Sequence, residues 1–347
     1  MNRLWLLVAV PLAVVLERAE AHPAVVFAAS LAAVIPLVGL MGRSTERLAA
    51  KLGPALGGLL NATLNNLPEL IIGTVALANG LTSVVKASLT GAILANLLLG
   101  LGVALVAGGL EHGDQRFDSG RLRISSSMLM ICAFCFIVPA VFSLGTPDGT
   151  RDLSLEMSFV LVAIYAINVL ATLLWGRSGT GLVADEEFVD EHPDVPAWRS
   201  VAALVASAGM LGLVSELLSN ALGPTAVQLG LSKTFSGLVL LGGVGSLGEI
   251  LSGAHFARQG RPSLLLSATV GSTIQLVLLV APLLVFAGRV LGVPMDLAFT
   301  AFEVVAIVLA AMITRELIQD GKANWFEGVL LLAVYAILAI GFFHLPD

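Results

Sequence analysis

The sequence predicts an all-α integral membrane protein, and three observations lead to that fold class. Of the 347 residues, 57% are apolar and only 12% are charged, whereas soluble domains carry about 25% charged residues. Eleven stretches of the chain are apolar and long enough to cross a bilayer. A pattern in the third of these stretches recurs 180 residues later. We therefore expect eleven transmembrane helices in which one unit of five spans occurs twice.

The expected helices follow from the thickness of the bilayer, since a core of about 30 Å needs about 20 predominantly apolar residues. The eleven stretches cover residues 3–18, 23–42, 53–79, 83–108, 124–145, 154–175, 198–220, 230–257, 262–289, 295–316 and 325–344. The connections between them are too short to hold a soluble domain. The longest polar connection, residues 176–197, is acidic. Its composition is compatible with a cytoplasmic surface helix or flexible loop and with a cation-attracting segment.

The first stretch admits two interpretations. It can be a retained transmembrane helix within residues 1–22, or a signal peptide, because Arg3 precedes it and it ends at an A-x-A pattern over residues 19–21. Removal of a signal peptide would leave the other ten spans in the same orientation. With the amino terminus inside, 13 Lys and Arg residues fall on the cytoplasmic side and five on the other. The positive-inside rule therefore predicts a cytoplasmic amino terminus and an external carboxyl terminus.

Charge and motif content exclude several function classes. The net charge of −6 gives no electrostatic basis for a nucleic-acid partner. The two cysteines, Cys132 and Cys135, lie in an apolar run and are interpreted as small apolar residues. No nucleophile, base and metal-ligand set converges in the sequence, so we expect neither an enzyme nor a resident cofactor.

The internal repeat is the most informative feature of the chain. Residues 65–73, NNLPELIIG, correspond to residues 245–253, GSLGEILSG, with Glu69 and Glu249 at the same place. The following spans keep the offset of 180 at Gly91 and Gly271. Five is an odd number of spans, so the two copies must lie in opposite orientations. Inverted repeats of this kind are typical of secondary transporters.

Each copy places one carboxylate deep in an apolar span, where an ionised group costs several kcal/mol unless it is partnered or hydrated. Pro68 precedes Glu69, and Gly245 and Gly248 precede Glu249, so we expect both helices to be broken beside the acid. Short polar residues surround the acids: Asn61, Asn65, Asn66 and Asn96 in the first copy, and Ser246, Ser272, Thr273 and Gln275 in the second. Hard cations such as Ca²⁺ take about 6 to 8 oxygen ligands. The amides can alternatively serve as hydrogen-bonding groups between helices.

The stretch LGPALGGLLNATLNNLPELIIG, residues 52–73, closely resembles the first signature of the cation/proton exchangers, a branch of the calcium/cation antiporter superfamily. Further similarity runs through SLTGAILANLLLGLG, DQRF at residues 114–117, LLSATVGSTIQLVLLVAPLLV, MDLAFTAFE and ITRELIQDGKANWFEGVLLLAVY. The resemblance covers essentially the whole chain. It implies a retained first helix outside two inverted five-helix repeats, residues 23–175 and 198–347, and exchange of Ca²⁺ for H⁺.

The resemblance also implies site residues. Asn66 and Glu69 match the first signature, Glu249 the second, and Asn96 and Gln275 the amides that follow. Glu46 and Glu216 fall where the family has acids beside the transport path. The chain departs from the family pattern at Ser246 and Ile250, where an asparagine and a histidine are usual, and at Ala92 and Ala95, where serines are frequent.

The mechanism expected from these residues is competition between Ca²⁺ and protons for Glu69 and Glu249, with alternating access to the site. The same acids would also suit an exchanger of another cation, such as Na⁺ or Mn²⁺, coupled to H⁺ or Na⁺. A membrane sensor that does not transport is a third class. The expected location is the plasma (inner) membrane of a prokaryote. The substrates are Ca²⁺ and protons, the surroundings are lipid, and the sequence leaves assembly into a homo-oligomer open.

Overall fold

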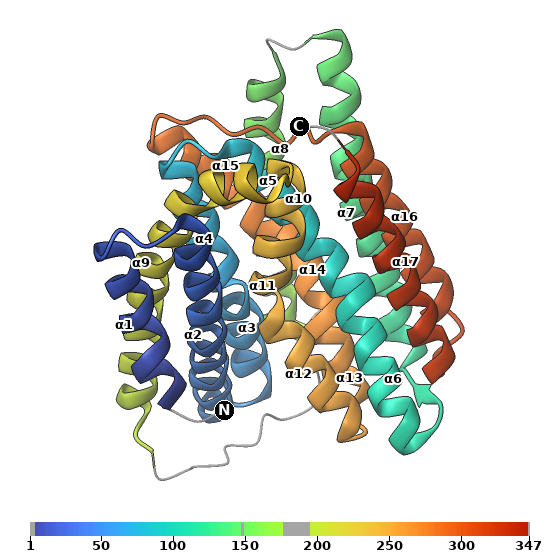
Figure 1. Ribbon diagram of the computed structural model, residues 1–347. Helices are drawn as coiled ribbons and strands as arrows, with labels where there is room; N and C mark the ends of the chain where they lie inside the picture. Colours follow the sequence, from blue (N-terminus) through green and yellow to red (C-terminus); the bar gives the residue numbers. More distant parts are fainter. Residues whose placement is uncertain (1–3, 147–148, 176–194, 346–347) are drawn as a thin grey trace.

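A computed structural model describes residues 4–146, 149–175 and 195–345, and these form helices that run side by side (Figure 1). Within the described residues, seven helices are long and apolar enough to cross a membrane, and one bent pair of helices passes the same test together. The prediction of a helical integral membrane protein is therefore confirmed. The acidic connection lies outside the described residues except at its end, residues 195–197.

Three long helices form one side of the molecule (Figure 1). Helix α1 spans Leu4–Arg18, α2 spans Pro23–Leu52 and α9 spans Ala197–Leu229, and α2 packs against both of the others. Helices α2 and α9 continue well past the expected spans, which ended at residues 42 and 220. The helical backbone extends beyond the apolar stretch because charged and polar residues are also good helix formers. Helix α2 stops at Gly53, whose φ of 78° ends the helical conformation.

The third and eighth expected spans are each divided in two. Helix α3, Pro54–Asn65, is separated from α4, Leu67–Ala78, by Asn66 with φ −86° and ψ 7°. The later span is broken at Ser246, which has φ −82° and ψ 7°. Before the break lie α10 (Lys233–Phe235), the π segment η4 (Ser236–Gly242) and α11 (Gly243–Gly245), and after it lies α12 (Leu247–Arg258). The two halves of this later span are bent by 47°. The two breaks are 180 residues apart in the sequence.

Two further spans are deeply buried and contain π-helical segments. The first comprises α5 (Thr82–Leu94), η1 (Ala95–Gly100) and α6 (Leu101–His112). The second comprises α13 (Pro262–Leu266), η5 (Ser267–Gly271), α14 (Ser272–Gln275), η6 (Leu276–Val280) and α15 (Ala281–Val290). Segments of π helix are rare and frequently occur at functional sites. Asn96 lies inside η1, and Gln275 lies between η5 and η6.

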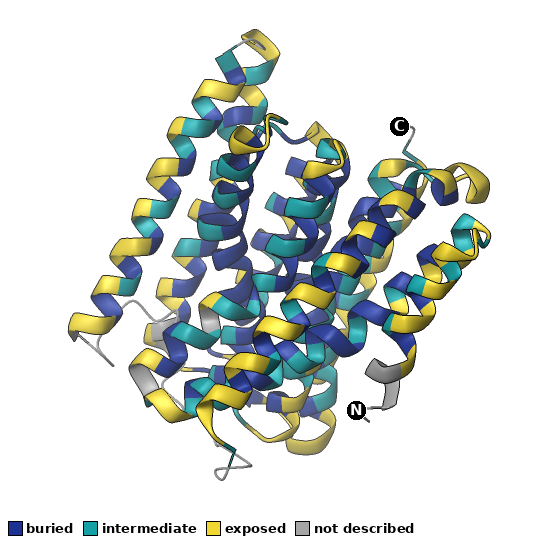
Figure 2. Cartoon of the chain, turned by 90° about the vertical axis from the view of Figure 1, so that its left-hand side faces the viewer, coloured by how far each residue is buried: buried dark blue, intermediate teal, exposed yellow. Residues whose placement is uncertain are grey.

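The remaining helices lie around these central spans. They are α7 (Ser119–Gly145), α8 (Thr150–Trp175), α16 (Ala301–Ile318) and α17 (Trp325–Phe343). Exposed apolar side chains follow α7 and α8, among them Ile131, Phe134, Val141, Phe159 and Ile167. Figure 2 shows buried residues concentrated in the inner helices and exposed residues along the outer faces. Outer faces of this composition suit contact with lipid.

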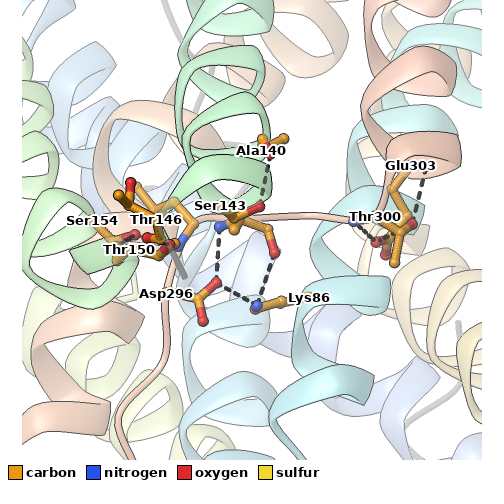
Figure 3. Close-up of polar contacts among 11 residues, drawn as sticks. Lys86, Ala140, Ser143, Thr146, Thr150, Ser154, Asp296, Thr300 and Glu303 are labelled. Atoms are coloured by element: carbon orange, nitrogen blue, oxygen red, sulfur yellow. Dashed lines mark hydrogen bonds and ion pairs between the residues drawn. The ribbon is translucent and has the colours of Figure 1, made fainter. Parts of the chain in front are cut away.

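One expected span begins later than the sequence predicted. Residues 295–300 are not helical, and α16 starts at Ala301 after a capping box formed by Thr300 and Glu303. The Asp296 carboxylate accepts from Lys86 Nζ at 2.5 Å, and Lys86 Nζ also donates to the Ala298 carbonyl at 2.9 Å (Figure 3). The Leu297 amide donates to Ser154 Oγ at 2.9 Å. These contacts satisfy polar groups of residues 296–298 without a helix. Hydropathy does not reveal such contacts, so it predicted a helix here.

Contacts between connections place them in two groups, one at each end of the molecule. Strand β1, Gln115–Arg116, pairs antiparallel with β2, Lys322–Ala323. Arg258 forms an ion pair with Glu111 at 3.4 Å, and Lys51 Nζ donates to the Val195 carbonyl. Each of these pairs joins two connections predicted to lie inside. The Lys86–Asp296 pair joins two regions predicted to lie outside.

Candidate cation-binding site

Glu69 and Glu249 occupy equivalent positions in two broken helices. Each is the third residue of the helix that follows the break, α4 and α12 respectively, and each is in the first turn. Their exposed fractions are 8% and 4%. The amino-terminal end of a helix has unbonded N–H groups and a partial positive charge. Each carboxylate therefore lies at the one part of a buried helix that favours a negative charge.

The first carboxylate reaches the second break. A side-chain Cβ placed on Gly245 would lie 3.6 Å from Glu69 Oε1, so the glycine leaves room for the Glu69 side chain directly before Ser246. Asn66 Nδ2 donates to Gln275 Oε1 at 2.9 Å, across 209 positions of sequence. Residues from both halves of the chain thus meet in one region.

Asn96 approaches this region through the π segment η1. Its side chain is fully buried, and η1 packs against α12. At that contact a Cβ on Gly100 would lie 3.3 Å from Cγ1 of Ile250, the residue after Glu249. Ser272 is buried at the start of α14, the short helix that ends at Gln275.

Several buried polar atoms in this region have no hydrogen-bond partner among the described residues. They are both carboxylate oxygens of Glu69, Oε2 of Glu249, both amide atoms of Asn96, the Ser246 hydroxyl and Oδ1 of Asn61. An unsatisfied buried polar group costs about 1–3 kcal/mol, and such groups are few in folded proteins. A bound cation would offset this cost because most of these atoms are oxygens that can coordinate it.

The chemistry of the donors favours a hard cation. No group of three or more His, Cys, Asp and Glu residues with metal-binding geometry occurs within residues 4–146, 149–175 and 195–345. Two carboxylates with amide and hydroxyl oxygens remain as the donor set. Oxygen ligands of these types suit Ca²⁺ and similar ions rather than metals that prefer nitrogen or sulfur.

A cavity of 720 Å³ leads to this region between α2 and α12. Its lining includes Glu249, Gly248 and Asn65, whereas Glu69 is not part of it. Polar and charged residues from the ends of the helices also line the cavity: Arg43, Glu46, Arg47, His255, Gln259 and Arg261. An ion that enters this cavity therefore meets Glu249 before Glu69. In the sequence these arginines mark the orientation of the spans, and no local pattern indicates that they line a cavity.

The two acids expected beside the path take different positions. Glu46 lines the cavity. Glu216 is exposed on α9 and accepts a hydrogen bond from Asn79 Nδ2 at 3.0 Å, at the end of α4. The fold therefore joins Glu216 to the far end of the half-helix that starts beside Glu69.

The helix breakers named from the sequence lie next to the breaks rather than at them. Pro68 is in the first turn of α4, where proline fits a helix because no backbone donor is lost. Gly248 is in the first turn of α12, and a Cβ there would lie 3.0 Å from Val38 Cγ1 of α2. The residues with non-helical conformation are the polar ones, Asn66 and Ser246.

The chain is similar to a family of cation exchangers and to named Ca²⁺/H⁺ antiporters. The sodium/calcium exchanger protein family matches residues 22–174 and 199–343. The Ca²⁺/H⁺ antiporter of Aphanothece halophytica is 37% identical over 337 residues, covering 92% of this chain and 90% of that protein. The Ca²⁺/H⁺ antiporter ChaA of Bacillus subtilis is 37% identical over 354 residues, covering 99% of this chain and 100% of that protein.

Solved structures show the same fold. The structure of native YfkE is similar with a TM-score of 0.86 and 34% sequence identity, and the similarity covers 99% of each chain. The crystal structure of the H⁺/Ca²⁺ exchanger CAX is similar with a TM-score of 0.77, covering 97% of this chain and 89% of that one. At 17% identity this second similarity is a likeness of fold.

Proposed function

The chain belongs to the sodium/calcium exchanger protein family, and from this membership and the site we infer that it is an antiporter that exchanges Ca²⁺ for H⁺ across a membrane. The named Ca²⁺/H⁺ antiporters that match it over at least 92% of its length support these substrates. The protein is a transporter and not an enzyme. Its substrates are the two cations, and no cofactor is needed for their exchange.

We propose that the chain crosses the membrane eleven times. In this arrangement α1 lies outside two inverted repeats, residues 23–175 and 198–347, and the acidic connection is cytoplasmic. The helix breaks at Asn66 and Ser246, 180 residues apart, support the repeat. The excess of basic residues on one set of connections supports a cytoplasmic amino terminus in a prokaryotic plasma membrane.

The observation that carries the mechanism is the pair of buried carboxylates at the starts of two half-helices. Ionised Glu69 and Glu249 together carry a charge of −2, which one Ca²⁺ or two protons can neutralise. Moving a neutral loaded site between the two sides of the membrane has a low desolvation cost, whereas moving the empty charged site is costly. Exchange is therefore obligatory, and a proton gradient drives Ca²⁺ transport.

Buried polar side chains around the carboxylates supply the rest of the ligand shell. We assign Asn66, Asn96, Gln275, Ser246 and Ser272 to this shell, because all five side chains are buried on the segments that meet there. The cavity beside Glu249 supports access from the side of the basic connections in this conformation. Glu46 then lies in the entry path on this side, and Glu216 on the opposite side.

Neutralising either carboxylate should abolish exchange. We expect Glu69→Gln and Glu249→Gln to lose ΔpH-driven ⁴⁵Ca²⁺ uptake into inverted membrane vesicles, because a site with a single carboxylate cannot compensate the charge of Ca²⁺. Glu316→Gln, which changes an exposed acid on α16, is the matched control and should transport normally. Wild-type uptake by both site variants would refute the assignment. The same assay with Na⁺ and Mn²⁺ in place of Ca²⁺ measures selectivity.

A further inference from the structure

One buried hydroxyl on α16 bonds to the backbone of the π segment η1. Thr314 Oγ1 donates to the Leu97 carbonyl at 3.3 Å, across 217 positions of sequence. Both residues have an exposed fraction of 0%. Leu97 directly follows Asn96. The hydrogen bond therefore joins α16 to the backbone directly after Asn96, a residue of the candidate cation site.

This hydrogen bond is not the usual one for a threonine in a buried helix. Threonine hydroxyls inside helices commonly bond to the carbonyl four residues earlier in their own helix, as Thr172, Thr269 and Thr273 do in this protein. Thr314 instead donates to a carbonyl on a different helix. In η1 the backbone bonds span five residues, as from the Leu101 amide to the Asn96 carbonyl. Side-chain hydroxyls are one means by which membrane helices satisfy backbone groups at such irregularities.

No hydrogen bond to a described residue fixes the direction of the Asn96 side chain. Neither of its amide atoms has a hydrogen-bond partner among the described residues. Asn66, by contrast, is held by Gln275 at 2.9 Å. The backbone of η1 therefore carries the orientation of the Asn96 side chain, and η1 packs against α12, the helix of Glu249. A change in the register of η1 would turn the amide relative to α12.

We propose that Thr314 is a positioning residue that holds η1 in its π-helical register and so directs the Asn96 amide oxygen to Ca²⁺. This inference rests on the proposed function, in which Asn96 is a ligand. Thr314 itself touches no ion. Its loss should weaken Ca²⁺ binding while the two carboxylates, and with them the coupling to protons, remain.

The expected size of the effect follows from known metal sites, where removal of a group that orients a ligand typically costs 10- to 100-fold in affinity. Because Asn96 is one of several ligands, we expect Thr314→Val to raise the Kd and the KM for Ca²⁺ about 10-fold, with a smaller change in kcat. Thr314→Ser keeps the hydroxyl and should restore wild-type values. A defect in packing alone would not be rescued by serine, which is smaller than valine.

Thr90→Val is the matched control. The Thr90 hydroxyl donates to Glu303 Oε1 at 3.4 Å and so also joins α5 to α16, but it lies outside η1. We expect this variant to keep the wild-type Kd even where it lowers the thermal unfolding temperature as much as Thr314→Val does. Equilibrium ⁴⁵Ca²⁺ binding to the purified full-length protein gives the Kd, and proteoliposome uptake gives KM and kcat.

Asn96→Ala separates failure of this inference from failure of the proposed site. Weak binding in both Asn96→Ala and Thr314→Val, with rescue by Thr314→Ser, supports the inference. Wild-type binding in Thr314→Val overturns it, and weak binding in Asn96→Ala then leaves the proposed site standing. Weak binding in Thr314→Val with normal binding in Asn96→Ala overturns the route through Asn96. A Thr314→Ser variant as weak as Thr314→Val, or an equally weak Thr90→Val, overturns the role of the hydroxyl.

Discussion

At the scale of single residues, the resemblance seen in the sequence predicts that the position after Glu249 differs from the usual pattern of the family. Ile250 is buried. Its side chain lies next to Gly100 of η1, where an added Cβ would be 3.3 Å from Ile250 Cγ1. The residue is therefore part of the contact between α12 and η1. An apolar side chain here keeps one titratable group out of the immediate surroundings of the two carboxylates.

A histidine at this position should make Ca²⁺ affinity depend more steeply on pH. Histidine changes its charge between about pH 5 and 8, and a positive imidazole next to Glu249 would repel Ca²⁺. We expect the ratio of the KM of Ile250→His to that of the wild type to increase as the pH is lowered from about 8 to about 6. Ile250→Gln, polar but without a titratable group, should show a constant ratio. If the histidine variant also kept a constant ratio, Ile250 would have no bearing on the pH dependence.

At the scale of elements, the segment before α16 is held by side chains from two other helices. Lys86 of α5 bonds Asp296 and the Ala298 carbonyl, and Ser154 of α8 accepts from the Leu297 amide (Figure 3). The side chains of Lys86 and Asp296 are 17% and 24% exposed, so water solvates this ion pair only in part. Helix α5 continues into η1, which carries Asn96. The bonds from Lys86 to residues 296 and 298 therefore hold the amino-terminal end of that span.

Removing the lysine should destabilise the fold more than it affects the site. In Lys86→Met, the Asp296 carboxylate loses its partner in a half-buried position, which costs about 1–3 kcal/mol. We expect a lower thermal unfolding temperature for the purified protein and a Kd for Ca²⁺ close to that of the wild type. Arg289→Met removes an exposed cation at the same end of the molecule and should unfold at the wild-type temperature. Equal unfolding temperatures for the two variants would mean that the Lys86 pair does not anchor the segment.

At the scale of the whole molecule, the cavity makes the two faces of the protein different. Its lining reaches Glu249 from the end of the molecule where the basic connections lie. At the other end, α5 and η4 pack so closely that a Cβ on Gly91 would lie 1.9 Å from the Leu238 carbonyl oxygen. Glycine at this contact lets the two backbones touch. In the proposed topology, the cavity opens to the cytoplasm.

Labelling of single cysteines tests the orientation. In a background with Cys132→Ala and Cys135→Ala, Gln259→Cys places a thiol at the cavity and Ser83→Cys places one at the exposed start of α5. We expect a membrane-impermeant maleimide to label Gln259→Cys in inverted vesicles and Ser83→Cys in intact cells. The reverse pattern would mean that the cavity opens to the outside and that the proposed topology is upside down.

The sequence by itself determined the helical membrane fold and the residues that stand out in it. Hydropathy requires only composition, and a carboxylate in an apolar span is conspicuous because its cost of burial is high. The offset of 180 residues between Glu69 and Glu249 predicted two equivalent half-sites before any contact was known.

Only the tertiary structure decided how the half-sites meet and what supports them. The bond from Asn66 to Gln275, the contact of Glu69 with Gly245 and the bond from Thr314 to Leu97 each join residues more than 170 positions apart. No local pattern encodes such contacts, because they depend on how whole helices pack. The π segments and the non-helical residues 295–300 also escaped prediction, since hydropathy records which residues avoid water and not where the backbone bonds change partner.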